Sequence, residues 1–90
     1  MTKEELDNWF IKGKMFSISL LNYYVDICYI KNSDEFILRV TDNNMNKYYY
    51  QFDNYEDALE FSYGVIDKTN TIEEIELSYL ALKEVKKQIK

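Results

Sequence analysis

The sequence predicts a small α+β domain in which an N-terminal helix is followed by a three-stranded antiparallel meander and two C-terminal helices. Three runs rich in aromatic and β-branched residues lie in the middle of the chain, separated by short segments of turn-forming residues. Amphipathic patterns with N-terminal capping residues flank these runs on both sides. Ninety residues without a proline-rich or glycine-rich linker indicate one domain, residues 1–90, and we expect the two last helices to pack on one face of the sheet.

The first predicted helix begins after Thr2, whose hydroxyl can cap it, with Glu5 at the capping-box position three residues later. Side chains at helical spacing give this helix one apolar face, formed by Leu6, Trp9 and Phe10. Gly13 is expected to end or kink it. The next segment, residues 15–21, alternates apolar and other residues as a strand does, but its spacing also fits a helix. We interpret it as an extended segment and do not count it among the three strands.

The three predicted strands read YYVDICYI, EFILRVT and NKYYYQF, and the segments KNSD and DNNM between them suit turns. Because successive side chains of a strand point to opposite sides, each face of the sheet can be assigned. The core face is predicted to carry Tyr23, Val25, Ile27, Phe36, Leu38, Val40, Tyr48, Tyr50 and Phe52. The opposite face is predicted to carry Tyr24, Asp26, Cys28, Arg39, Thr41, Lys47, Tyr49 and Gln51.

Two amphipathic helices are predicted after the strands. The first follows the capping residue Asn54, and its apolar arc contains Tyr55, Ala58, Leu59, Phe61, Ser62, Val65 and Ile66. The second opens with the capping box formed by Thr71 and Glu74, and its apolar arc contains Ile72, Ile75, Tyr79, Leu82, Val85 and Ile89. Leu77 and Leu80 fall outside that arc, so they are either covered by the first helix or available to a partner.

Negative charge is concentrated in one segment of the chain. The whole sequence carries a formal net charge of −5, whereas residues 53–76 hold eight acidic residues and one basic residue, for −7. These acids are the predicted partner-binding residues: Asp53, Glu56, Asp57, Glu60, Asp67, Glu73, Glu74 and Glu76. A solvated helix face explains such a run equally well, but Glu56 and Glu60 repel each other at i,i+4 and no lysine alternates with them. An acidic surface of this kind attracts basic partners and disfavours phosphate backbones.

The composition argues against several classes of function. Histidine is absent and cysteine occurs once, so we predict no metal site, no cofactor and no catalytic residues. Cys28 would be a reactive thiol if Arg39 lay beside it, but an inert buried cysteine is the competing interpretation. The nine tyrosines lack the cationic groove that base stacking requires, so we expect no direct binding of nucleic acid. Without a signal peptide or a long apolar run, we expect a cytoplasmic protein that does not enter membranes.

The order of the predicted elements, in an acidic chain of this length without proline or histidine, resembles the small phage-encoded anti-CRISPR proteins that inhibit the type II RNA-guided nuclease. The stretch DNNMNKYYYQFDNYEDALEFS occupies the corresponding strand-to-helix position, and the resemblance is one of topology and charge. Members of that group place carboxylates where the nuclease grips a short DNA element with arginines, and in one of them a turn of the sheet also contributes.

The resemblance implies a phage or mobile-element protein that inhibits a basic host protein that binds nucleic acid, with a CRISPR effector nuclease as one candidate. The alternative is a homo-oligomeric structural or regulatory module, for example a homodimer, in which Leu77, Leu80 and exposed tyrosines form the interface.

Overall fold

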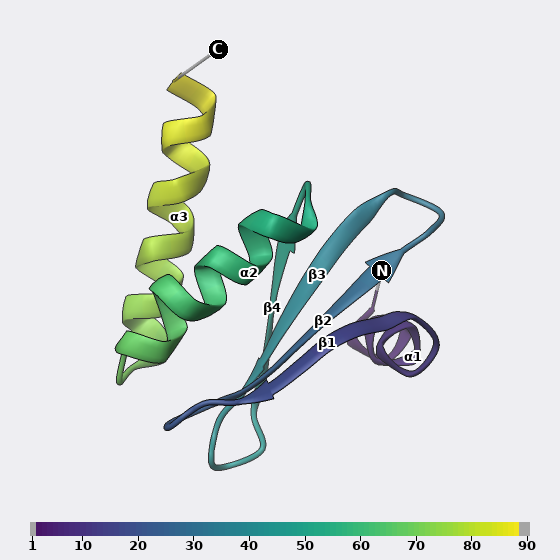
Figure 1. Ribbon diagram of the computed structural model, residues 1–90, viewed down its shortest axis with the longest axis horizontal. Helices are drawn as coiled ribbons and strands as arrows, with labels where there is room; N and C mark the ends of the chain where they lie inside the picture. Colours follow the sequence, from purple (N-terminus) through teal and green to yellow (C-terminus); the bar gives the residue numbers. More distant parts are fainter. Residues whose placement is uncertain (1, 89–90) are drawn as a thin grey trace.

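The computed structural model describes residues 2–88, and it describes side chains for residues 2–84. In chain order the elements are α1 (Lys3–Gly13), β1 (Lys14–Ser19), β2 (Tyr24–Ile30), β3 (Glu35–Thr41), β4 (Lys47–Phe52), α2 (Tyr55–Gly64), the 3-10 turn η1 (Ile66–Lys68) and α3 (Ile72–Gln88). The strands form one antiparallel sheet in the order β1-β2-β3-β4. Figure 1 shows α2 and α3 on one side of this sheet and α1 on the other. The α+β class is confirmed, with α1 before the sheet and two helices after it.

The sheet has four strands, so the predicted three-stranded meander was one strand short. The interpretation of residues 15–21 as an extended segment was correct. Part of that segment belongs to β1, which pairs antiparallel with β2. A tight turn closes this hairpin, with the Leu20 amide donating to the Tyr23 carbonyl at 2.8 Å. In this hairpin, the alternate residues Phe16 and Ile18 both pack against the main core. The segment therefore follows the strand pattern and not the helix pattern. A register shift between Lys14 and Phe16 marks a bulge where β1 leaves α1.

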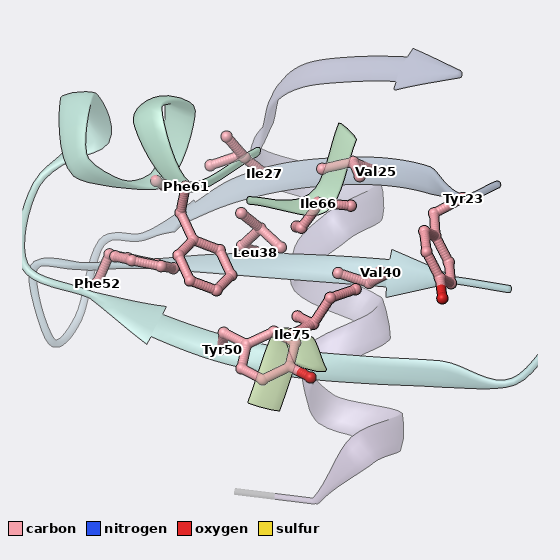
Figure 2. Close-up of a cluster of buried hydrophobic side chains, with 11 residues drawn as sticks. Tyr23, Val25, Ile27, Leu38, Val40, Tyr50, Phe52, Phe61, Ile66 and Ile75 are labelled. Carbon is pink, nitrogen blue, oxygen red and sulfur yellow. The ribbon is translucent and has the colours of Figure 1, made fainter. Parts of the chain in front are cut away.

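The main core lies between the sheet and the C-terminal helices. Its buried side chains are Tyr23, Val25, Ile27, Leu38, Val40, Tyr50, Phe52, Ala58, Phe61, Ile66 and Ile75, most of which are labelled in Figure 2. Phe36 and Tyr48 pack against them, so the predicted core face of the sheet is confirmed. The rings of Tyr50, Phe52, Phe61 and Tyr79 lie within 4.9 to 6.1 Å of one another in five pairs, at angles favoured by aromatic contacts.

A second, smaller core lies on the opposite face of the sheet. It contains the buried residues Phe10, Cys28, Ile30 and Ile37, with Leu6, Trp9 and Tyr49 packed against them. The predicted apolar face of the first helix is therefore confirmed. Both faces of the sheet are covered by helices, and the charged residues of the second face lie beneath α1 or beside it.

The predicted helix starts are confirmed by their capping bonds. The Glu5 amide donates to Thr2 Oγ1 at 3.2 Å, and the Glu74 amide donates to Thr71 Oγ1 at 3.3 Å. The tightest cap is at α2, where the Asp57 amide donates to Asn54 Oδ1 at 2.9 Å. Of the apolar arc predicted for α3, Ile75 is buried and Ile72, Tyr79 and Leu82 are partly buried, while the side chains of Val85 and Ile89 lie outside the described residues.

Gly13 is the last residue of α1, as the sequence predicts, and the chain passes close to β2 at this point. A Cβ atom at residue 13 would lie 2.8 Å from the main-chain oxygen of Tyr29. Real Cβ atoms do not approach backbone so closely, so α1 reaches its place over β2 only with glycine at this corner.

Candidate protein-binding surface

The predicted partner-binding acids all reach the surface. Asp57 is half-buried, and the other seven are exposed: Asp53, Glu56, Glu60, Asp67, Glu73, Glu74 and Glu76. Asp53 precedes α2, three of the acids lie on α2, Asp67 lies in η1, and the remaining three lie in the first turns of α3. All eight positions are therefore placed on the layer formed by the C-terminal helices and the connections to it.

The structure does not gather these acids into one patch. Figure 1 shows that α2 begins beside the end of β4, whereas α3 begins at the other end of the sheet, near the β1–β2 and β3–β4 turns. A ten-residue helix such as α2 rises about 15 Å between these two ends. Glu56 at the start of α2 and Glu73 and Glu74 at the start of α3 consequently lie toward opposite ends of the sheet. Glu76 is placed differently again, in a groove along the outer edge of β4.

The β3–β4 turn adds a carboxylate that sequence reasoning did not include. The pKa of Tyr23 is raised first by burial and then by negative charges that include Asp42 and Glu74, so both carboxylates lie within electrostatic reach of one hydroxyl. A hollow of about 210 Å³ lies at this point, lined by Asn22, Tyr23, Asp42, Asn43, Asn44 and Asn70. We call Asp42, Glu74 and the residues lining this hollow the turn-end surface.

Asp42 is held rigidly by its own turn. Its Oδ1 accepts the Asn44 and Asn46 amides, both at 2.9 Å, and its Oδ2 accepts the Asn46 side-chain amide at 3.3 Å. These bonds hold the pKa of Asp42 below its usual value of 3.8, so this carboxylate stays ionised at neutral pH. The sequence DNN signals such a turn, but nothing local indicates that the turn lies near the start of α3.

The salt bridges among the described residues involve acids other than the exposed glutamates of α2 and α3. Among residues 2–84, the salt bridges join Asp7 and Asp26 to Lys14, Arg39 and Lys47. Within this same part of the chain the structure shows no salt bridge to five of the predicted acids: Glu56, Glu60, Glu73, Glu74 and Glu76. Their charge remains available to a partner.

The ion pairs that do form attach α1 to the sheet. Arg39 Nη2 donates to the fully buried Asp26 Oδ2 at 2.6 Å, and Arg39 Nη1 donates to Asp7 Oδ1 on α1 at 2.9 Å. The Tyr49 hydroxyl donates to the same Asp7 oxygen at 2.7 Å. The guanidinium carbon of Arg39 also lies 4.2 Å from the centre of the Phe10 ring. This network is structural and lies away from the turn-end surface.

Cys28 belongs to the second core and is not poised as a nucleophile. Burial raises the pKa of its thiol to about 11, although Arg39 acts in the opposite direction. A thiol with that pKa is protonated at neutral pH, and the side chain is fully buried. The interpretation of Cys28 as an inert buried residue is the one that the structure supports.

Leu77 and Leu80 are both exposed, with 67% and 59% of their surface accessible. They lie on α3, on the opposite side of the sheet from α1, so the first helix does not cover them. Within residues 2–84, no three His, Cys, Asp or Glu side chains converge as metal ligands do. None of the described helices is both long enough and apolar enough to cross a membrane.

Comparison of the chain with protein-family models, with curated protein sequences and with solved structures finds no match.

Proposed function

We propose that this protein is a small inhibitor of the kind encoded by phages and mobile elements, which acts in the host cytoplasm. It binds a basic host protein that handles nucleic acid by presenting carboxylates in place of DNA phosphates, as the anti-CRISPR proteins that it resembles do. A type II RNA-guided nuclease is the first target to test. The observation that carries the proposal is the segregation of charge: the described ion pairs engage Asp7 and Asp26, and the exposed glutamates of α2 and α3 are left without salt bridges to described residues.

The turn-end surface has a composition suited to a protein that grips DNA. Carboxylates of Asp42 and Glu74 can accept hydrogen bonds from Arg or Lys, as phosphates do. The asparagine side chains of the adjacent hollow offer further donors and acceptors. Asp42 of the β3–β4 turn and Glu74 of α3 both lie within electrostatic reach of the Tyr23 hydroxyl, which supports a surface to which a turn and a helix both contribute.

Electrostatics would act mainly on the rate and selectivity of association. A net charge of −5 accelerates encounter with a basic groove, and the acceleration declines as salt screens the charges. Affinity that persists in salt would come from apolar surface, and exposed Met45 in the β3–β4 turn and Leu21 in the β1–β2 turn provide it.

The test uses the purified nuclease loaded with guide RNA. Binding of the wild-type protein is measured by interferometry, in competition with duplex DNA carrying the recognition element, at about 0.05 M and about 0.3 M salt. A variant with Glu56, Glu60, Glu73 and Glu74 changed to Gln keeps the side-chain size but removes four charges. We expect it to bind at least about tenfold more weakly at low salt. Unchanged binding of this variant would eliminate the mimicry mechanism, and failure of the wild type to bind would eliminate this nuclease as the target.

The alternative function is self-association through α3. It is favoured by the exposure of Leu77 and Leu80 on one helix, because adjacent apolar side chains on a surface indicate an interface. Sedimentation velocity over a wide concentration range distinguishes the two proposals. A dimer that becomes monomeric on changing both leucines to Ser supports the alternative, and a monomer at all concentrations removes it.

A further inference from the structure

The outer edge of β4 has main-chain groups that face away from the sheet. Gln51 shows this directly, because its amide donates to the Tyr79 hydroxyl at 3.1 Å and its carbonyl accepts from that hydroxyl at 2.7 Å. Alternate residues of an edge strand face the same way, so the main-chain groups of Tyr49 and Lys47 also face outward. Within residues 2–84 the structure gives these outward groups no hydrogen-bond partner. Two consecutive outward positions of β4 are thus free to pair with another strand.

A groove follows this free edge. Its volume is about 350 Å³, and it is lined by Lys3, Leu6, Lys47, Tyr48, Tyr49, Tyr50 and Glu76. A hollow of about 210 Å³ adjoins it and adds Tyr79 and Leu80 to its walls. Figure 2 shows why the groove forms: α1 crosses behind the sheet and its first turns continue past β4, while the start of α3 lies in front of that strand.

The two walls of the groove carry opposite charges. Lys47 and Lys3 lie on the α1 side, and Glu76 lies on the α3 side. Lys47 is only loosely engaged, because its Nζ lies 3.8 Å from Asp7, whose other oxygen already accepts from Arg39 and Tyr49. The floor between the walls is aromatic and aliphatic. The side chains of an extended strand point alternately to two sides, so one strand can place acidic groups against the lysine wall and a basic group against the Glu76 wall.

We propose that this groove binds an extended peptide segment of a partner protein by adding it as a fifth strand beside β4. Main-chain bonds to Tyr49 and Lys47 supply affinity. Acidic side chains of the peptide face Lys3 and Lys47, and an intervening basic side chain faces Glu76. This is a second interaction surface, separate from the turn-end surface.

A single strand fits this site better than a second copy of the chain. If β4 paired with β4 of a second copy about a two-fold axis, both α1 helices would lie on the same face of the joined sheet. The lysines of one copy would then lie toward those of the other. An alternating acidic and basic peptide does not bring like charges together in this way.

The test measures binding of a blocked heptapeptide in which three glutamates alternate with an arginine and a valine between terminal threonines. A second peptide has every charge reversed. We expect the first peptide to bind the wild-type protein at least about tenfold more tightly than the second. Its addition should shift the NMR signals of the Lys47 and Tyr49 amides, and methylation of the peptide nitrogens that face β4 should abolish binding.

A charge-swapped protein gives the reciprocal result. The double substitution Lys47→Glu with Glu76→Lys should reverse the preference between the two peptides. The matched control is Lys68→Glu with Glu73→Lys, which makes the same changes at exposed positions outside the groove and should leave the preference unchanged. Circular dichroism confirms that both variants are folded.

Three results would overturn the proposal: neither peptide shifts the β4 amides at millimolar concentration, both peptides bind equally, or the β4 amides shift with protein concentration alone while sedimentation reports a dimer. The inhibitor hypothesis is tested independently. The variant with four glutamates changed to Gln keeps every groove residue and should still bind the heptapeptide.

Discussion

The buried pair of Asp26 and Arg39 should be a major determinant of stability, because it lies between the sheet and α1. Asp26 has no accessible surface, and its carboxylate accepts from Arg39 at 2.6 Å and from Ser17 Oγ at 2.8 Å. The substitution Asp26→Asn keeps the size and one acceptor oxygen but removes the negative charge. Arg39 would then keep a single carboxylate partner, the half-exposed Asp7.

The expected cost follows from these contacts. Removing one partner of a buried ion pair costs about 3 to 5 kcal/mol when the remaining charge is left uncompensated. Asp7 still compensates Arg39 in part, and Asn can still bond to Ser17, so we expect a loss of about 2 to 3 kcal/mol. With a urea m-value of about 1 kcal/mol per molar, the unfolding midpoint should fall by about 2 to 3 M.

The assay is urea unfolding followed by the fluorescence of Trp9, the single tryptophan, which lies on α1 in the second core. Asp34→Asn is the matched control. Asp34 is exposed, accepts from the Tyr29 hydroxyl at 2.8 Å and has a φ of 53°, a conformation that Asn also adopts readily. The control should change stability by less than about 0.5 kcal/mol. If Asp26→Asn were no more destabilising than Asp34→Asn, the ion pair would not hold α1 in place.

Three further predictions concern other contacts. Tyr79→Phe removes the hydroxyl that bonds to both main-chain groups of Gln51, and it should lower the thermal stability by about 1 kcal/mol; no change in melting temperature would contradict this. Burial acts to raise the pKa of Asp7, but hydrogen bonds from Tyr49 and Arg39 lower it below 3.8 overall. The ionised Asp7 therefore stabilises the fold above pH 4, and this contribution is lost as the pH falls further. An acid titration of Asp7→Asn should show a weaker pH dependence than the wild type. Cys28 should react with a thiol reagent only as fast as the protein unfolds, and rapid labelling of the folded protein would contradict its burial.

The elements that the sequence predicted well are those specified by neighbouring residues. Thr2, Asn54 and Thr71 cap their helices through bonds to amides three residues away, so the signal and its effect lie in the same short segment. The missed strand is the opposite case. Residues 15–21 fit two periodicities, and the pairing of residues 14–19 with β2 selected the strand.

The amount of charge in a segment follows from the sequence, whereas the placement of that charge depends on the tertiary structure. The acidity of residues 53–76 is a property of the sequence, but α2 separates its acids into groups at opposite ends of the sheet. The approach of Asp42 to the start of α3 joins residues more than thirty positions apart. No local pattern encodes that proximity, because it depends on how the sheet and the helices pack.

The sequence by itself determined the class of fold, the helix starts, the inward face of the three predicted strands and the net negative charge. These properties follow from side-chain periodicity and capping, which act over a few residues. Only the tertiary structure decided that α1 covers the second face, that Arg39 joins Asp26 to Asp7 beneath it, and that α1 and α3 together form a groove at β4. Those features arise where distant segments meet, and long-range packing and burial select them.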